Sequence, residues 1–314
     1  MIHIEHFTFN SFQTRCSVVW DDSGVCAFVD PGCASAAELS RLTAFTASRG
    51  LRPAAIMLTH AHFDHIYGVD ALVREYGIPV YMHPDEVYTL RNTNPYVCRM
   101  YGLPEPETAF ADGLLSGSAG GAASQPGCGP TSEPGCGSGD ETASGPACGS
   151  VSEKACGPGA GLVTVVEGDV IKVGTLRFEV IETPGHTAGG ICLFERENGV
   201  LFTGDTLFAG AIGRTDHPGG DYDQLMKSIL QKLLPLDSSA ASGPVVSGPA
   251  VSGPAASGSP TAPATPAGVT SAGAASAPAP RNITVVPGHG PCSDLATEGM
   301  TNPFLMPFNE PYED

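Results

Sequence analysis

Basic residues are scarce in this sequence. Its 314 residues include 15 Lys and Arg against 33 Asp and Glu, so the formal net charge at pH 7 is −18. A protein that binds nucleic acid needs a patch or stripe of positive charge to neutralise the phosphates. The composition therefore predicts a protein without a nucleic-acid partner.

Long apolar runs are missing as well. No stretch approaches the roughly 20 apolar residues that a membrane-spanning helix needs. Residues 1–6 contain no basic segment followed by an apolar one, which a secretory signal would require. We therefore expect no membrane association and no signal peptide, and a cytoplasmic location.

Closely spaced cysteine pairs are absent although the sequence has ten cysteines. Cysteine-based zinc sites usually show pairs two to four residues apart, whereas four cysteines here are separated by 8, 12 and 8 residues: Cys128, Cys136, Cys148 and Cys156. A metal-binding or redox role for these four is the alternative to a simpler interpretation, repeat expansion of a Cys-Gly-Pro-like unit. The other six are scattered without a pairing pattern, as expected for reduced thiols.

Large apolar residues are nearly absent from two stretches. Residues 116–160 are rich in Gly, Ser and Pro, and residues 238–280 consist of Ser-Gly-Pro-Ala/Val and Ala-Pro units without any charged residue. Such segments cannot bury enough apolar surface to offset the entropy cost of ordering the chain. We predict two disordered insertions in a single domain that spans residues 1–314. The remaining residues, about 225, suffice for an adequate core.

Possible metal ligands, by contrast, are concentrated. The segment Thr-His-Ala-His-Phe-Asp-His begins at Thr59, directly after an apolar run, and contains four of them: His60, His62, Asp64 and His65. On a helix, side chains two residues apart point about 200° away from each other and could not share an ion. Where a strand turns into a loop, the first two histidines can converge on one metal while Asp64 and His65 face a second position. The spacing therefore predicts a two-metal site at a strand-to-loop junction.

Three more possible ligands repeat this placement. His186, Asp205 and His289 each follow a strand-like apolar stretch and each have a neighbouring glycine, which lets the backbone turn sharply. A lone histidine is more often a packed or solvated residue than a ligand. Five histidines in one recurring arrangement indicate instead that the side chains gather along one edge of a sheet assembly.

These four clusters, in this order, resemble the metallo-β-lactamase superfamily. Longer stretches look like the short, single-domain glyoxalase-II-like (hydroxyacylglutathione hydrolase-like) enzymes: Thr-Gly-Asp-Thr-Leu-Phe-Ala-Gly at 203–210, Gly-Arg-Thr-Asp at 213–216, Pro-Gly-His-Gly-Pro at 287–291 and Asn-Pro-Phe-Leu at 302–305. The resemblance covers roughly residues 1–115, 161–236 and 281–314. It implies a mixed α/β fold, the four-layered αββα sandwich.

The resemblance also implies a ligand set. The first metal would be held by His60, His62 and His186, and the second by Asp64, His65 and His289, with Asp205 bridging both. Two divalent ions are expected. Zinc is the first choice because imidazole and carboxylate donors suit it, while iron and manganese fit the same ligands.

The activity that the resemblance implies is hydrolysis of a small-molecule thioester, S-D-lactoylglutathione or a related hydroxyacyl thioester. A hydroxide shared by the two ions would be the nucleophile, because divalent metals lower the pKa of bound water to about 7. Asp64 would be both ligand and the residue that orients this hydroxide. Only Cys292–Asp314 follow the last ligand, too few for the helical domain with which full-length glyoxalase II helps to hold glutathione. The sequence therefore supports a thioester as the substrate more strongly than it supports glutathione as the thiol of that thioester.

Two other functions remain open. A mononuclear iron dioxygenase that acts on glutathione persulfide shares the donors of the first metal and the stretch at 213–216. Gly288 before His289 favours the hydrolase, because the persulfide enzymes usually have Ala there. A non-enzymatic scaffold that keeps the metal for stability is disfavoured by the seven ligands, since structural zinc sites are normally closed cages of four.

Neighbouring residues have expected roles. Asp30, at a strand end, is either a simple turn residue or the hydrogen-bond partner of a ligand histidine or of the metal loop. Arg214 and Asp216 are expected to form a structural pair, in preference to binding substrate. His217 is expected to be a partly exposed packing residue.

Periodicity and turn signals predict strands and helices that mix without the strict alternation of a Rossmann fold. Ser35 and Glu38 form a capping box at the start of one helix, and Pro84 opens another. Three consecutive strands are expected to form a meander, near 162–166, 169–173 and 175–181.

Overall fold

The computed structural model describes residues 1–116, 153–155, 161–239 and 282–306. The first predicted insertion, 116–160, needs one correction, because Glu153–Ala155 forms strand β6, which pairs in parallel with β8 (Val170–Val173). The rest of both insertions, and with it their predicted disorder and the four cysteines of the first, lies almost entirely outside the described residues. Within those residues, no helix is both long and apolar enough to cross a membrane.

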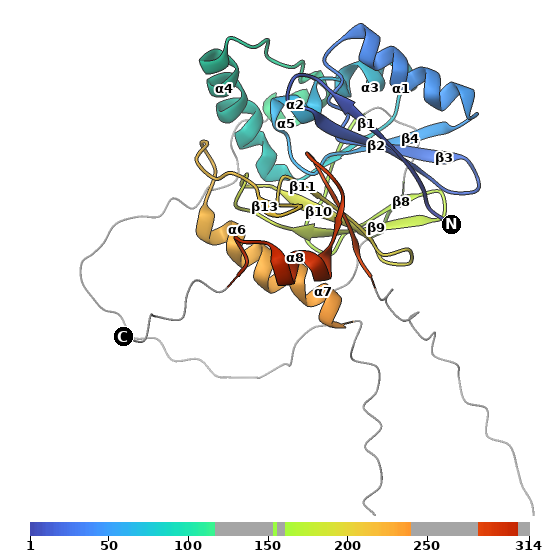
Figure 1. The fold of residues 1–314 in the computed structure, drawn as a ribbon. Coiled ribbons are helices and arrows are strands. Elements are labelled where there is room, and N and C mark those ends of the chain that lie inside the picture. Colours follow the sequence, from blue (N-terminus) through green and yellow to red (C-terminus); the bar gives the residue numbers. More distant parts are fainter. Residues whose placement is uncertain (117–152, 156–160, 240–281, 307–314) are drawn as a thin grey trace, which may run out of the picture.

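Two sheets make up the centre of the molecule (Figure 1). The first has the strand order β1 (His3–Phe9), β2 (Thr14–Trp20), β3 (Val25–Val29), β4 (Arg52–Met57), β5 (Val80–Met82) and β7 (Leu162–Thr164). The second has the order β15 (Ser293–Asp294), β14 (Thr284–Pro287), β11 (Val200–Gly204), β10 (Ile191–Glu195), β9 (Leu176–Glu182), β8 and β6. A small hairpin of β12 (Leu207–Phe208) and β13 (Ala211–Ile212) stands beside them.

Helices cover the outer face of each sheet, as Figure 1 shows. Those on the side of the first sheet are α1 (Ala36–Ser48), α2 (Phe63–Ile66), α3 (Val69–Tyr76), α4 (Asn94–Tyr101) and α5 (Asp112–Ser116), together with the short segments η1 (Pro84–Glu86), η2 (Thr89–Thr93) and η3 (Ala109–Ala111). Those on the side of the second sheet are α6 (Tyr222–Ser228), η4 (Ile229–Leu233), α7 (Leu234–Ser239) and α8 (Leu295–Thr301). The predicted αββα sandwich is confirmed.

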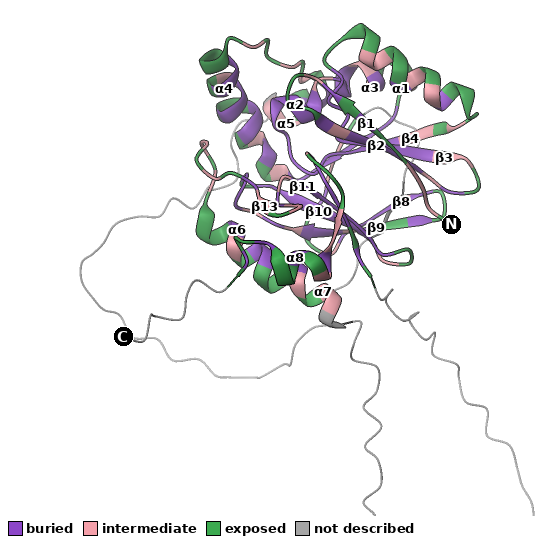
Figure 2. Ribbon diagram, in the orientation of Figure 1, coloured by how far each residue is buried: buried purple, intermediate pink, exposed green. Residues whose placement is uncertain are grey.

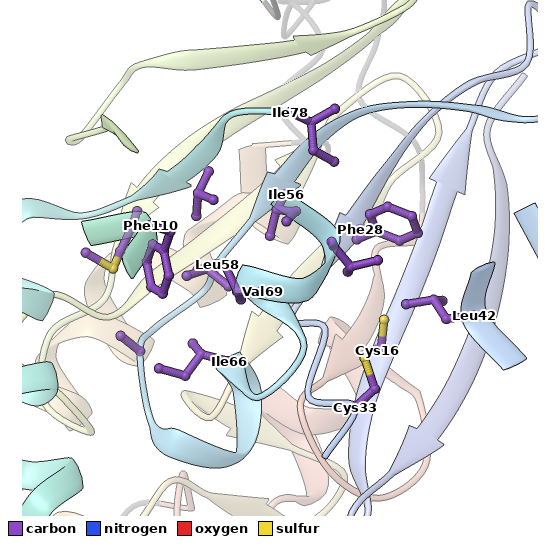
Figure 3. Close-up of a cluster of buried hydrophobic side chains, with 14 of the residues drawn as sticks. Cys16, Phe28, Cys33, Leu42, Ile56, Leu58, Ile66, Val69, Ile78 and Phe110 are labelled. Carbon is purple, nitrogen blue, oxygen red and sulfur yellow. The ribbon is translucent and has the colours of Figure 1, made fainter. Parts of the chain in front are cut away.

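Most of the core lies in three layers, one between the first sheet and its helices, one between the two sheets and one between the second sheet and its helices. Figure 2 shows that the central strands are largely buried. Because side chains alternate along a strand, neighbours face different layers. Ile56 of β4 packs with Phe28 and Leu42 against the helices (Figure 3), whereas the next residue, Met57, packs between the two sheets. Both faces of the central strands are therefore apolar.

Of the predictions about individual helices and strands, one is confirmed, one is wrong and one is confirmed only in part. The capping box is present, since Ser35 Oγ accepts a hydrogen bond from Glu38 N at 3.2 Å and Glu38 Oε2 accepts one from Ser35 N at 3.1 Å. The predicted meander is wrong: β7 joins the first sheet, parallel to β5, while β8 and β9 pair in the second. Pro84 opens only the short segment η1, and the longer helix begins further on.

The fold brings four loops to one edge of the two-sheet sandwich. The chain leaves β4, β9, β11 and β14 at this edge, and a predicted ligand cluster follows each of these strands. β3 and β4 run parallel in the first sheet, and β11 and β14 run parallel in the second. Parallel neighbours end on the same side, so loops that are distant in sequence meet where the two sheets face each other.

Candidate metal centre

The first group of side chains comes from both sheets. His60 and His62 lie in the loop after β4, and His186 lies in the loop after β9. One ring nitrogen of each lies within 4.8 Å of the others. His186 Nε2 is 2.9 Å from His62 Nδ1, so these nitrogen lone pairs converge on a small volume, as ligands of one ion do.

The second group lies beside the first. It consists of Asp64 and His65 on α2 and His289 after β14, again with ligand atoms within 4.8 Å of one another. Asp205 stands between the groups: its Oδ1 is 3.5 Å from His65 Nε2, and its Oδ2 is 3.6 Å from His186 Nε2. The structure thus brings together all seven residues that the sequence singles out.

Buried polar atoms test whether these residues fit metal ions. Among the described residues, six buried side-chain nitrogens and oxygens have no hydrogen-bond partner, and four belong to this centre: His60 Nε2, His62 Nε2, His65 Nδ1 and Asp205 Oδ1. A buried polar atom without a partner costs roughly 1–3 kcal/mol. His60 Nε2 and Asp205 Oδ1 are donors of the kind that divalent metals take, and His62 faces His186 with its other ring nitrogen, Nδ1. The residues present therefore fit the predicted ions.

Protonation at the first group and at Asp64 favours metal binding too. Burial lowers the pKa of His60 and His62 well below the usual value of histidine. Burial alone would raise the pKa of Asp64, but the neighbouring His65 together with hydrogen bonds from His289 and Thr14 outweighs burial, and the pKa falls to about 2. Neutral imidazoles and ionised carboxylates are the forms that bind metals.

Hydrogen bonds fix the orientation of the second group. Asp30 accepts hydrogen bonds from Thr59 N at 2.8 Å and Thr59 Oγ1 at 2.6 Å, and its Oδ2 lies 3.3 Å from His65 Nδ1. Asp30 therefore contacts both a predicted ligand histidine and the metal loop, not merely a turn. The Nδ1 atom of His289 donates to the carbonyl of Phe12 at 3.0 Å, which leaves Nε2 facing Asp205.

Two buried residues that the sequence analysis missed hold the metal loops. Glu86 has no exposed surface, and its two oxygens accept hydrogen bonds from Ala61 N at 2.7 Å and Gly189 N at 3.0 Å. Ala61 lies between the first two histidines, and Gly189 lies three residues after His186. Asn94 donates to Ala61 O at 2.8 Å and accepts from Phe63 N at 3.0 Å. No motif marks either residue, because the partners are backbone groups distant in sequence.

A cleft of about 600 Å³ opens beside the centre. The residues that line it are Phe12, His62, Phe63, Asp64, Val97, Tyr101, His186, Asp205, Phe208, Ala211, Ile212, Arg214, His217 and His289. Arg214 pairs with Asp216, with Nε 2.7 Å from Oδ1, so the predicted pair is present. His217 is half-buried, and its ring lies 6.2 Å from that of His62. The interpretation of His217 as a packing residue is therefore incomplete, because it faces the cleft.

A model of the metallo-beta-lactamase superfamily matches residues 10–243. The chain belongs to the metallo-β-lactamase superfamily. Family membership, together with the donor set, confirms the predicted class of enzyme, a metal-dependent hydrolase.

Relatives within this superfamily include hydroxyacylglutathione hydrolase GloC of Haemophilus influenzae, 29% identical over 236 residues that make up 75% of this chain and 86% of that protein. Among solved structures, BLEG-1 B3 metallo-beta-lactamase gives a TM-score of 0.61 at 26% identity, covering 97% of this chain and 100% of that one. TTHA1623, solved in a di-iron-bound form, gives 0.58 at 25% identity, covering 96% and 100%.

Proposed function

We propose that this protein hydrolyses a thioester, S-D-lactoylglutathione or a related 2-hydroxyacyl thioester, with two divalent metal ions. The observation that carries the proposal is the pair of three-residue groups on either side of Asp205. A hydroxyacylglutathione hydrolase among the relatives supports the same chemistry.

The proposed ligands of the first ion are His60, His62 and His186. Those of the second are Asp64, His65 and His289, with Asp205 shared. Ions bound there would supply an activated water at neutral pH and polarise the carbonyl group of the substrate. We propose zinc for both positions, while the donors also suit iron, the metal in the TTHA1623 structure.

Asp64 is the proposed catalytic residue. Its Oδ2 accepts a hydrogen bond from Thr14 Oγ1 at 2.7 Å and lies 3.4 Å from His289 Nε2, which holds the carboxylate in one orientation. Because its pKa is near 2, Asp64 is ionised at neutral pH and can accept a hydrogen bond from the attacking water.

The choice of leaving group rests on the absence of a protonated carboxyl group among the described residues that line the cleft. Burial lowers the pKa of His217, so its imidazole is neutral at pH 7, and Asp64 and Asp205 are ionised. Among the described residues that line the cleft, none offers a carboxylic acid to protonate a departing group. A thiolate leaves without protonation far more readily than an amine or an alkoxide, which favours a thioester.

Gly288 favours the hydrolase over the iron dioxygenase. A Cβ atom at this position would lie 2.3 Å from Asp205 Oδ1 and 2.7 Å from His65 Cε1. An alanine, which the persulfide enzymes usually carry there, would push Asp205 and His65 away from the second position. The glycine is thus compatible with two metals sharing Asp205.

An assay of thiol release and oxygen uptake tests the proposal. Zinc-loaded protein should release thiol from S-D-lactoylglutathione without consuming oxygen, and chelation should abolish this activity. Asp64→Asn should lower kcat severely while the protein remains folded by circular dichroism. Oxygen uptake with glutathione persulfide, and no thiol from any thioester, would assign the protein to the dioxygenases instead.

A further inference from the structure

The cleft beside the metal centre has an apolar wall. Phe12 comes from the turn between β1 and β2, and its ring packs edge-on against that of Phe63 on α2, with centroids 5.1 Å apart. Val97 and Tyr101 of α4 and the hairpin residues Phe208 and Ile212 extend this wall. Residues from four separate elements therefore present apolar surface to one cavity.

This wall reaches the proposed ligands themselves. Phe63 stands between His62 and Asp64 in sequence, and the Phe208 ring lies 6.2 Å from that of His289. A carbonyl carbon attacked at the metal centre would lie next to these rings. The side chain of the acyl group and the thiol are both attached to that carbon, so each begins beside these rings.

Lysine and arginine are almost absent from the described lining of the same cleft. Among the described lining residues, Arg214 is the one lysine or arginine, and its Nε and one terminal nitrogen each donate to an oxygen of Asp216 at 2.7 Å. The chain as a whole carries a formal charge of −18. Apart from the proposed ions themselves, an anionic thiol such as glutathione therefore gains little attraction from the side chains of the cleft.

The size of the cleft points the same way. Cavities of about 300–1,000 Å³ typically hold ligands of drug size, and this one measures about 600 Å³. A lactoyl group carries a single methyl beyond its hydroxyl and carboxyl carbons and would leave the Phe12–Phe63 pair uncovered.

We propose that the cleft selects thioesters with a large apolar acyl group, aromatic or branched, packed against Phe12, Phe63 and Phe208. This inference rests on the proposed function, because it names the substrate class of the same site. Two substrates that differ by one methylene group in an apolar pocket differ in kcat/KM by about tenfold or more. Replacing the methyl of a lactoyl thioester by phenyl should therefore raise kcat/KM at least about tenfold.

A series of thioesters with one uncharged thiol, N-acetylcysteamine, tests the proposal on the zinc-loaded full chain. The acyl groups are lactoyl, 2-hydroxy-4-methylpentanoyl and mandeloyl, and kcat/KM should rise in that order. A second series keeps the lactoyl group and changes the thiol from N-acetylcysteamine to benzyl mercaptan, and kcat/KM should change little.

Phe12→Ala is the informative variant. The atom of Phe12 that accepts from His289 is a backbone carbonyl, so metal content and melting temperature should stay the same. The preference for mandeloyl over lactoyl should fall at least about fivefold. Phe304→Ala is a matched control, since Phe304 is 42% exposed against 40% for Phe12 but does not line the cleft.

Two results would overturn the inference while the proposed function stands: equal kcat/KM along the acyl series, or a preference that follows the thiol instead of the acyl group. Equal effects of Phe12→Ala and Phe304→Ala would likewise remove the role of the apolar wall. Failure to hydrolyse every thioester in both series would refute the proposed function, and this inference with it.

Discussion

Replacing Glu86 by Gln would reveal how the two metal-bearing loops are held together. The carboxylate accepts a hydrogen bond from Ala61 N with one oxygen and from Gly189 N with the other. A glutamine side chain has one acceptor oxygen, so one of these two backbone N–H groups would face an NH2 group. Both partners are buried, and water cannot replace the lost acceptor.

The cost follows from this lost acceptor. A buried N–H without a partner costs roughly 1–3 kcal/mol. Burial also raises the pKa of Glu86, which means that the charged form is itself costly, and Gln avoids this cost. We expect a net loss of about 1–2 kcal/mol, which for a domain of this size lowers the melting temperature by about 2–4 °C per kcal/mol. Misaligned loops should weaken zinc binding about tenfold, the factor that 1.4 kcal/mol represents.

Asp70→Asn is the matched control. Asp70 is buried like Glu86, and its two oxygens also accept from two backbone N–H groups, those of Ala109 at 2.9 Å and Phe110 at 2.8 Å. It joins α3 to η3 and contacts neither metal loop. The melting temperature of the metal-free protein should fall in both variants, whereas chelator competition should show weaker zinc binding in Glu86→Gln alone. Equal zinc affinities in the two variants would refute the proposed clamping role.

Three further predictions concern other parts of the chain. Elemental analysis should show that Gly288→Ala reduces bound zinc from two equivalents to about one, because the added Cβ displaces Asp205. Gly113→Ala is the control, since nothing lies within 4 Å of its added Cβ. Two zinc equivalents in Gly288→Ala would contradict the prediction. Burial alone would raise the pKa of Asp21, but hydrogen bonds from Ser23 and Thr175 lower it to about 2, and the resulting stabilisation is present above about pH 4 and lost as the pH falls through 2. The loss of unfolding free energy caused by Asp21→Ala, measured by urea unfolding, should therefore shrink by about 2 kcal/mol between pH 5 and pH 2. The same loss at both pH values would contradict this prediction. Replacing residues 117–152 by a Gly-Ser linker should leave metal content and melting temperature nearly unchanged, because that segment offers no apolar face; unfolding of the shortened protein would show that it packs on the core.

The ligand cluster was predictable from sequence because its signal is local. A strand-like run followed by donors two residues apart indicates a site at a strand end whatever the rest of the chain does. The order of strands in the sheets was not predictable in the same way. Leu162 packs on the helix side and Val163 between the sheets, so apolar alternation identifies β7 as a strand but not its partner.

Glu86 shows a second limit of the sequence. Its partner Gly189 lies 103 positions away and contributes only a backbone N–H, which every residue except proline has. Nothing in the side-chain pattern distinguishes this glutamate from one on the surface, and its neighbours Pro84 and Asp85 indicate merely the start of a helix. Contacts between a side chain and distant backbone appear only once the sheets are placed.

The two ends of the sandwich are held by different means, and this has a consequence for the metal-free protein. Asp21 lies shortly before β3 and accepts a hydrogen bond at 2.6 Å from the N–H of Thr175 in the second sheet. At its other end, β3 leads into Asp30, which lies beside the metal loop. At the ligand end, seven buried or partly buried polar side chains face one another, and some of their nitrogens have no hydrogen-bond partner. Burying such atoms is costly, so without bound cations the two sheets are expected to move apart at this end. Loss of metal should therefore loosen the ligand end first, while the Asp21 end and the apolar layer between the sheets keep the fold. Hydrogen exchange of the metal-free protein should be fast in the loops at 59–65 and 184–190 and slow in β2 and β3; uniform protection of both ends would show that the metals add nothing to the packing of the two sheets.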